Sequence, residues 1–332
     1  MAIRYGYKAS AEQFGPVELL EYAKQAERLG FESVGISDHF QPWQHTDGHS
    51  PFALGWLSAA AVSTTSVSLG TSVLTPTLRY APAIVAQAVA TVGCFAPGRV
   101  FLGVGTGEAM NEMPPTGGEW PGAKERRLRM AEAIELIRRL WTEERVDFDG
   151  QWYSTRRATI YDRPDEPIPI WIAASGPLAA KLAGRAGDGF ICTSGKDPEL
   201  YTTLLAAVEE GAAKAGRDAS AITRMIEVKV SYDTDREAAE RHCRPWAALA
   251  LTPEQKSGVD DPMEMERLAE ENADRAPSRF IVSDDPDEVV ERIATYVDLG
   301  FTELVFHHPG EDQARALDLF ARDVLPRLRE RF

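Results

Sequence analysis

Residues 3–37 read IRYGYKASAEQFGPVELLEYAKQAERLGFESVGIS. Residues 3–7 and 33–37 are short runs of the kind that form buried strands. Between them, apolar side chains recur three or four positions apart, at Leu19, Tyr22, Ala26 and Leu29. Pro16 stands near the start of this pattern and Gly30 just after its end, as is typical of a helix. The stretch predicts a strand, a helix and a second strand.

The same alternation continues to the end of the chain. Further strands are predicted at residues 67–73, 100–104, 168–173, 189–193, 225–230 and 303–306. A helical stripe follows the fourth strand, at Leu128, Ala131, Ile134, Ile137 and Trp141, and a last helix is expected over residues 312–329. Eight such units in 332 residues predict one α/β domain, a (β/α)8 TIM barrel over residues 1–332. An open, doubly wound sheet is the alternative, because a strand count does not establish closure.

Three segments interrupt the repeat. Residues 111–123 are rich in Gly and Pro and are expected to form a loop on the active face. Residues 145–154 carry a hairpin signal around Asp149 and Gly150. Residues 245–276 form a long acidic insertion with a helical pattern.

Composition excludes several classes of protein. The net charge of −15 argues against a nucleic-acid or anionic-membrane surface, which requires a basic face. No apolar run approaches the roughly 18 residues of a membrane span, and the start of the chain lacks an apolar signal core. The three cysteines are far apart and form no Cys-x-x-Cys pair, so we expect neither a disulfide framework nor a cysteine zinc site. A cytoplasmic location is expected.

In a barrel, the side chains just past each strand face the active site. Applied in chain order, this rule selects Ser10, Glu12, Asp38, His39, Trp43, Ser72, Val73, Thr75, Thr106, Gly107, Glu108, Ser175, Gly176, Thr193, Ser194, Lys196, His307 and His308.

Asp38 and His39 form the most specific candidate for a catalytic pair, because a His beside a carboxylate can carry a proton near neutral pH. The alternative is an Asp that caps a helix and a His that only packs. A metal site is not expected, because the first strand lacks the His-x-His of barrel metallohydrolases. His307 and His308 would point to opposite sides of their strand.

The run from Gly103 to Glu108 has the spacing Gly-x-Gly-x-Gly, and no helix is expected directly after it. As a dinucleotide signature it is weak. A backbone without side chains suits close approach to a flat ring, and Glu108 would be the ionisable group beside it. The alternative is a solvated loop Glu.

Lys196 ends a Thr-Ser-Gly-Lys turn whose amides and hydroxyls can hold a phosphate. An ordinary solvated Lys is the alternative. Lys256 and Arg279 lie in or after the insertion, where the pattern alone assigns them no role.

Four runs of sequence, at residues 8–14, 37–43, 71–77 and 103–108, closely resemble those of the glucose-6-phosphate dehydrogenases that use coenzyme F420, an 8-hydroxy-5-deazaflavin. These enzymes belong to the bacterial luciferase-like (β/α)8 family, and the resemblance extends over essentially the whole chain. It implies a hydride transfer from C1 of a sugar 6-phosphate, glucose 6-phosphate first, to the coenzyme. It also implies a homodimer.

The resemblance assigns roles to individual residues. His39, Glu108, Trp43 and Glu12 match the active-site positions of the family. The positions that hold the deazaflavin are matched by Asp38, Ser72, Val73, Thr75, Thr106, Gly107, Asn111, Ser175 and Gly176, with a non-prolyl cis peptide at Ser72–Val73. Those of the sugar-phosphate pocket are matched by Thr193, Lys196, Lys256 and Arg279.

The chain departs from the family pattern at three places: Ser175-Gly176 replaces Gly-Gly, Ser257 replaces a His, and the loop at residues 114–119 differs. These departures concern the identity of the sugar. The alternatives to the implied function are a flavin-dependent monooxygenase on the same barrel, a catalytically silent barrel that binds a phosphorylated ligand, and, more distantly, a nicotinamide dehydrogenase.

Overall fold

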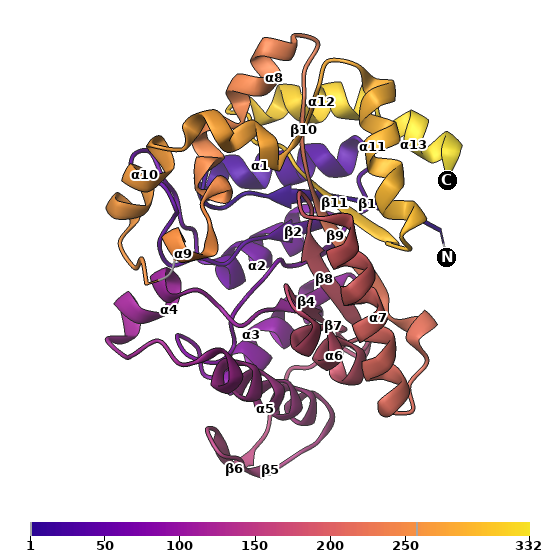
Figure 1. Cartoon of the computed structure of the whole chain (residues 1–332). Coiled ribbons are helices and arrows are strands. Elements are labelled where there is room, and N and C mark those ends of the chain that lie inside the picture. Colours follow the sequence, from indigo (N-terminus) through magenta and orange to yellow (C-terminus); the bar gives the residue numbers. More distant parts are fainter. Residues whose placement is uncertain (1, 257) are drawn as a thin grey trace.

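A closed barrel of parallel strands forms the centre of the computed structural model, which describes residues 2–256 and 258–332 (Figure 1). The sheet closes because β11 pairs with β1 and β8 pairs with β9. In order around the barrel the strands are β1 (Arg4–Ala9), β2 (Ser33–Ile36), β3 (Ser68–Thr71), β4 (Val100–Val104), β7 (Ile170–Ala173), β8 (Gly189–Thr193), β9 (Thr223–Tyr232) and β11 (Glu303–His307). All eight correspond to predicted strands, and closure excludes the open sheet. Ser257, one of the expected departures, lies outside the described residues.

Helices surround the barrel, and most of them follow a strand. They are α1 (Pro16–Arg28), α2 (Ala53–Ser63), α3 (Pro82–Phe95), α4 (Ala109–Thr116), α5 (Ala123–Thr142), α6 (Pro177–Ala186), α7 (Pro198–Lys214), α8 (Arg236–His242), α11 (Pro286–Asp298), α12 (Gln313–Asp323) and α13 (Leu325–Arg331). Across the described residues, no helix has the length and apolar character that a bilayer span requires. The short strand β10 (Ile281–Ser283) extends the sheet beside β9 and was not predicted.

The prediction of one last helix over residues 312–329 was wrong. The structure has two helices there, α12 and α13, which meet at Val324. Pro326 has no N–H to donate to the carbonyl four residues back, and its ring would clash with that carbonyl, so the first helix cannot continue.

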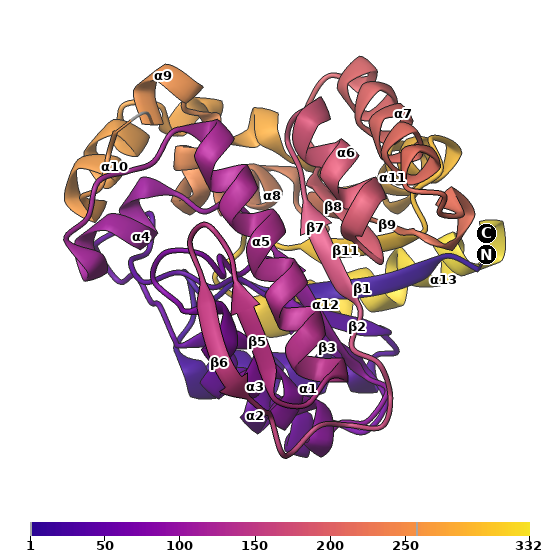
Figure 2. The same ribbon diagram turned by 90° about the horizontal axis from the view of Figure 1, so that it is seen from below.

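The expected hairpin around Asp149 is confirmed: β5 (Val146–Asp149) and β6 (Ser154–Ala158) are antiparallel and lie beside α5 (Figure 2). The expected loop at residues 111–123 was wrong in its first half, because α4 begins directly after Glu108. The backbone N–H groups of Asn111 and Glu112 donate to the carbonyl of Glu108. Pro114 and Pro115, which suggested a loop, lie within this short helix.

The insertion is helical, as expected, and lies at the mouth of the barrel. It contains a 3-10 segment (Arg244–Ala250), α9 (Pro253–Lys256), α10 (Pro262–Glu270) and a second 3-10 segment (Ala273–Arg279). Leu251 and Met265 form an apolar cluster with Met110 of α4. The insertion is therefore packed against the helix that follows Glu108, and Figures 1 and 2 both show α10 near α4.

The barrel interior changes from apolar to charged along its axis. A middle layer consists of Phe101, Trp171, Ile191, Met225 and Val305, with the rings of Phe101 and Trp171 stacked at 4.1 Å between centroids. Nearer the C-terminal ends, the barrel strands carry another set of buried side chains, Lys8, Glu227, Lys229 and His307. The apolar layer thus forms a plug beneath a charged floor.

Candidate active site

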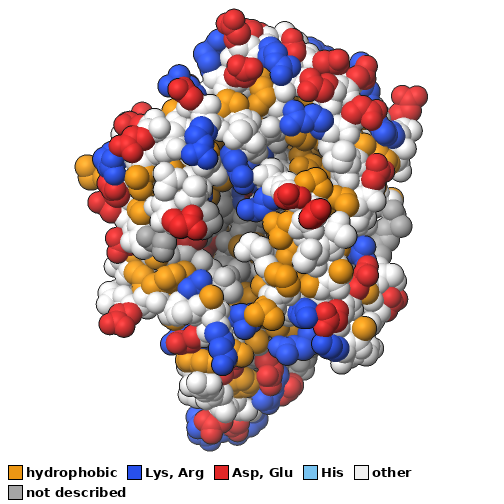
Figure 3. Space-filling view, in the orientation of Figure 1, with side chains coloured by type: hydrophobic (Ala, Val, Ile, Leu, Met, Phe, Trp, Pro, Cys, Tyr) orange, Lys and Arg blue, Asp and Glu red, His pale blue; other side chains and the backbone are white. Residues whose placement is uncertain are grey.

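A cavity of about 660 Å3 lies at the C-terminal ends of the strands, where Figure 3 shows a hollow edged by Lys and Arg side chains. Most of the predicted site residues line it: Glu12, Asp38, His39, Trp43, Ser72, Val73, Thr75, Thr106, Gly107, Glu108, Asn111, Ser175, Thr193, Lys196, Lys256 and Arg279. Gly176 is not part of the lining and caps the start of α6 instead.

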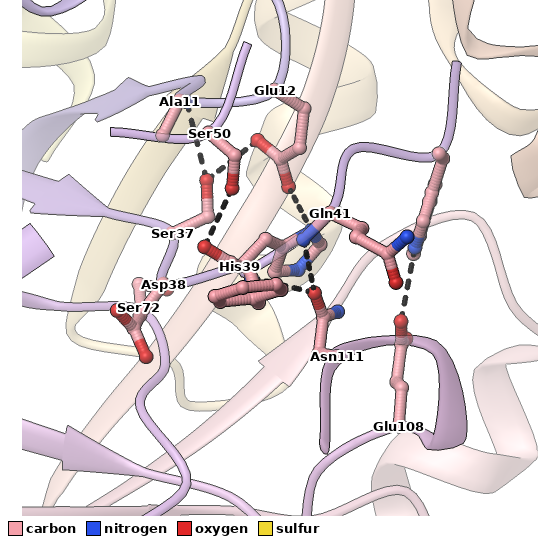
Figure 4. A network of polar contacts seen from close by, with 12 residues as sticks. Ala11, Glu12, Ser37, Asp38, His39, Gln41, Ser50, Ser72, Glu108 and Asn111 are labelled. Carbon is pink, nitrogen blue, oxygen red and sulfur yellow. Dashed lines mark hydrogen bonds and ion pairs between the residues drawn. The ribbon is translucent and has the colours of Figure 1, made fainter. Parts of the chain in front are cut away.

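His39 has a carboxylate partner, but that partner is Glu12 and not the adjacent Asp38. The Nδ1 atom of His39 lies 3.2 Å from Oε1 of Glu12, and the Ser37 hydroxyl donates to Oε2 of Glu12 at 2.6 Å (Figure 4). Burial raises the pKa of Glu12, but His39, Lys8 and Ser37 outweigh it, so that the pKa is lowered. The approach of Glu12 to Nδ1 is a close charge contact without hydrogen-bond geometry. Nε2 is therefore the ring nitrogen of His39 that remains for proton transfer.

Asp38 is bound to two residues that the strand-end rule does not select. Arg79 donates to Oδ2 of Asp38 at 2.6 Å, and the Tyr80 hydroxyl donates to Oδ1 at 3.0 Å. Burial raises the pKa of Asp38, and the Arg79 guanidinium opposes this rise. The sequence-based pairing of Asp38 with His39 was therefore wrong, because the guanidinium occupies the Asp38 carboxylate.

Arg79 also connects the loop after β3 to α4. Its backbone N–H donates to Oε2 of the buried Glu112 at 2.9 Å, and its Nε atom lies 3.7 Å from Oε1. Burial raises the pKa of Glu112 as well. Next to it, the Asn111 side-chain oxygen accepts from the backbone N–H groups of Phe40, at 2.8 Å, and Gln41. These contacts fix the segment that carries His39 against α4.

Trp43 stands between a carboxylate and a cation. Its indole N–H donates to Oε2 of Glu108 at 2.9 Å, and the Lys256 ammonium lies 4.6 Å from the centroid of its ring. Burial lowers the pKa of Lys256, while the charge of Glu108 opposes this shift. Glu108 is exposed and lines the cavity, where its carboxylate is held by Trp43, and α9 of the insertion contributes to its surroundings.

Three cations line one part of the cavity. Burial and the nearby Arg279 lower the pKa of Lys196, and Arg279 and Lys196 both help to lower that of Lys256. The Nε atom of Arg279 is buried and has no hydrogen-bond partner among the described residues. Cations that destabilise one another in this way create a site suited to an anion.

An uncharged wall lines another part. It contains Ser72, Val73, Thr75, Gly105, Thr106, Gly107, Ala173 and Ser175, and the Ser72–Val73 peptide is cis, as the resemblance implied. The glycines make room for neighbouring side chains: a Cβ at Gly105 would lie 2.7 Å from Cγ2 of Val73, and one at Gly107 would lie 2.9 Å from the Thr75 hydroxyl. The bare backbone thus serves packing of the wall.

The strand-end rule missed the charged floor, because Lys8, Glu227 and Lys229 lie within strands. Lys8 Nζ is 3.2 Å from Oε2 of Glu227, whose Oε1 is 3.7 Å from Nδ1 of His307. Burial lowers the pKa of Lys229 to about 8. Inward-pointing charges two residues apart on β9 are the sequence signal that could have identified this floor.

His307 and His308 point in different directions, as expected: His307 packs edge-on against Trp246, and His308 against Phe320. The described residues contain no group of three or more His, Cys, Asp or Glu side chains placed to hold a metal ion.

The fold and the cavity define a (β/α)8 barrel with a polar site at its C-terminal mouth. A profile of the luciferase-like monooxygenases matches residues 3–303. The chain belongs to this luciferase-like family.

Relatives and a solved structure agree with this assignment. A protein of Beutenbergia cavernae named F420-dependent glucose-6-phosphate dehydrogenase is 63% identical over 331 residues, which cover 99% of this chain and 98% of the relative. A protein of Intrasporangium calvum with the same name is 60% identical over 98% of this chain and 99% of its own. An F420-dependent secondary alcohol dehydrogenase, solved with an F420–acetone adduct, superposes with a TM-score of 0.93 at 34% identity and 99% coverage of both chains.

Replacement of Arg79 by Met should destabilise the protein by about 3–5 kcal/mol at pH 7, because it leaves two buried carboxylates without their cation. The pKa values of Asp38 and Glu112, already raised by burial, should rise further. A carboxyl group with a raised pKa contributes stability below its unfolded pKa and loses it as pH rises through the folded pKa. The loss of stability caused by Arg79→Met should therefore be smaller at pH 5 than at pH 8.

Guanidinium unfolding curves at several pH values measure this effect. Arg156→Met, on an exposed side chain of β6, is the matched control and should change stability little at any pH. An equal loss for Arg79→Met at every pH would contradict the assignment of Arg79 as the partner of these carboxylates.

Proposed function

We propose that the protein oxidises glucose 6-phosphate at C1 with coenzyme F420 as hydride acceptor, giving 6-phosphogluconolactone and reduced coenzyme. The observation that carries this proposal is the convergence of Lys196, Lys256 and Arg279 in the cavity that also contains the Glu12–His39 pair. A phosphate site and a proton acceptor in one cavity suit a phosphorylated alcohol. The activity named for the relatives at 63% and 60% identity is the same.

The uncharged wall fits the flat ring of a deazaflavin, because it presents small neutral side chains. When bound there, coenzyme F420 supplies a carbon that accepts a hydride, and it reacts poorly with oxygen. We assign its binding to Asp38, Ser72, Val73, Thr75, Thr106, Gly107, Asn111, Ser175 and Gly176. Of these, Asp38 and Asn111 act in part by fixing the loops that shape the cavity, because Arg79 and the backbone of Phe40 already occupy their oxygens.

His39 is the proposed base. Glu12 contacts Nδ1 of the imidazole and so leaves Nε2 to accept the proton of the C1 hydroxyl. The carboxylate also stabilises the imidazolium that this transfer creates. The proton goes to His39 and the hydride to the coenzyme, so that the C1 hydroxyl becomes the lactone carbonyl.

Glu108 and Trp43 complete the catalytic set. The indole N–H holds the carboxylate of Glu108 in place at 2.9 Å, and we assign Glu108 to the charge that develops on the ring during reduction. Trp43 is assigned to one side of the sugar site, where its ring limits the access of water.

Thr193, Lys196, Lys256 and Arg279 are assigned to the phosphate. An acidic protein binds a dianion only if cations gather locally, and the buried Nε of Arg279 lacks a partner that a phosphate oxygen would supply. Binding energy from this remote group positions C1 for reaction.

The flavin-dependent monooxygenase that the family also contains is not favoured, because the relatives named above use coenzyme F420. Absorbance spectra recorded after mixing the protein with F420 or with FMN separate the two. A parallel assay of F420 reduction with glucose, mannose and fructose 6-phosphates tests the substrate.

In that assay His39→Ala should lower kcat about 10²–10⁴-fold, the usual range for a general base, with the Kd for F420 little changed. His45→Ala, an exposed His on the same loop, is the control and should retain wild-type turnover. Near-wild-type kcat in His39→Ala would remove His39 from the mechanism.

Arg279→Ala should raise the KM for glucose 6-phosphate roughly 10- to 150-fold, because a hydrogen bond to a charged group contributes about 1.5–3 kcal/mol. Free glucose should be a poor substrate of the wild type and unaffected by the change. Arg275→Ala, exposed in the same 3-10 segment, is the matched control. Equal turnover of glucose and glucose 6-phosphate would refute the phosphate site.

We further propose that the protein works as a cytoplasmic homodimer of this single barrel domain. Free cysteines at positions 94, 192 and 243 suit a reducing compartment. The adjoining helices α2 and α3 contain no charged residue, yet Val62, Ile84 and Phe95 on them are 67%, 58% and 53% exposed. Uncharged helices with exposed apolar side chains are typical of a surface that a second copy covers.

The variant with both Val62→Glu and Ile84→Glu should sediment as a monomer at concentrations where the wild type is a dimer. Val17→Glu, at a 76% exposed apolar position of α1, should leave the dimer intact. Sedimentation equilibrium measures both, and a dimer that survives the double change would place the interface elsewhere.

A further inference from the structure

We infer that Lys8 is a positioning residue that joins the Glu12–His39 pair to the wall assigned to the coenzyme. The side chain of Lys8 is buried in the cavity floor, and its ammonium donates to the backbone carbonyl of Ser72. It also forms an ion pair with Glu227 at 3.2 Å. The assignment of this wall to the coenzyme rests on the proposed function, whereas the contacts of Lys8 are observed independently of it.

The first connection is mechanical. Ser72 and Val73 lie in the loop after β3, and the Ser72 carbonyl belongs to the peptide that precedes Val73. A charged donor on β1, with a side chain that is only 6% exposed, holds this carbonyl from within the barrel. Lys8 thereby fixes the position of Val73, whose side chain packs against Gly105.

The second connection is electrostatic. Glu12 lines the same cavity as Lys8, its side chain is only 10% exposed, and burial alone would favour its neutral form. The positive charges of His39 and Lys8 oppose that tendency and keep the carboxylate ionised. An ionised Glu12 is in close charge contact with His39, so Lys8 acts on the proposed base through Glu12 without touching it.

Glu227 limits the effect of Lys8. The charged and titratable groups around the ammonium are Glu227 and Lys229 from β9, His307 from β11, Glu12 after β1 and His39 after β2. Removal of the positive charge of Lys8 should make protonation of the Glu12–His39 pair easier. Removal of the negative charge of Glu227 should make it harder. A purely structural role would not produce opposite effects.

The test is an NMR titration of the His39 ring in the coenzyme-free protein, with the signal assigned by His39→Asn. In Lys8→Gln the midpoint should move upward by roughly half a pH unit, and in Glu227→Gln it should move downward by a similar amount. Lys214→Gln, a 71% exposed side chain on α7, should leave it unchanged. Lys8→Met, which also loses the donor to Ser72, should weaken F420 binding about tenfold or more, measured by absorbance.

Shifts of the same sign in Lys8→Gln and Glu227→Gln, or no shift in either, would overturn the inference. If the Lys8 variants do not fold, Glu227→Gln decides alone, and an unchanged midpoint rejects the link. The NMR readout needs neither coenzyme nor sugar. A wild-type protein that fails to reduce F420 with glucose 6-phosphate would reject the proposed function and leave the Lys8 result standing.

Discussion

The backbone pairing between β8 and β9 is the constraint on which the site depends, because it closes the sheet. Closure brings the C-terminal ends of eight strands around one mouth, so residues as distant in sequence as Glu12 and Arg279 line one cavity. The plug of apolar side chains that includes Phe101 and Trp171 seals the barrel beneath. Polar groups above it can therefore be stabilised only by one another or through the mouth. Lys8 accordingly pairs with Glu227 and His39 with Glu12, whereas the cations at Lys196, Lys256 and Arg279 remain available to an anion that enters through the mouth.

Much of this arrangement could be predicted from the sequence. Strand and helix periods are local properties, and all eight barrel strands follow from them. The strand-end rule then selects His39, Glu108 and Lys196 because the fold places those positions at the mouth. Local periodicity does not show whether a proline ends a helix or is accommodated within it. The break at Val324 before Pro326 was therefore missed, and so was α4, which contains Pro114 and Pro115.

Partners across the fold were harder to predict than positions along the chain. Asp38 stands beside His39 in sequence, but Arg79, 41 residues later, occupies its carboxylate, and Glu12 takes its expected place. Such choices depend on side-chain reach and on the cost of burying an unpaired charge, and neither can be read from spacing. The role of Lys8 was hidden for the same reason, since an inward-facing lysine within a strand looks anomalous until its partners are known.

The position of the insertion has a consequence for how this fold changes in evolution. Lys256 and Arg279 come from the segment between β9 and β10, whereas the Glu12–His39 pair and the uncharged wall belong mainly to the first half of the barrel. Mutations that accumulate in residues 244–279 can alter which group is recognised while the residues around the ring stay the same. Divergence of substrate preference among descendants of this barrel is therefore separable from loss of its chemistry.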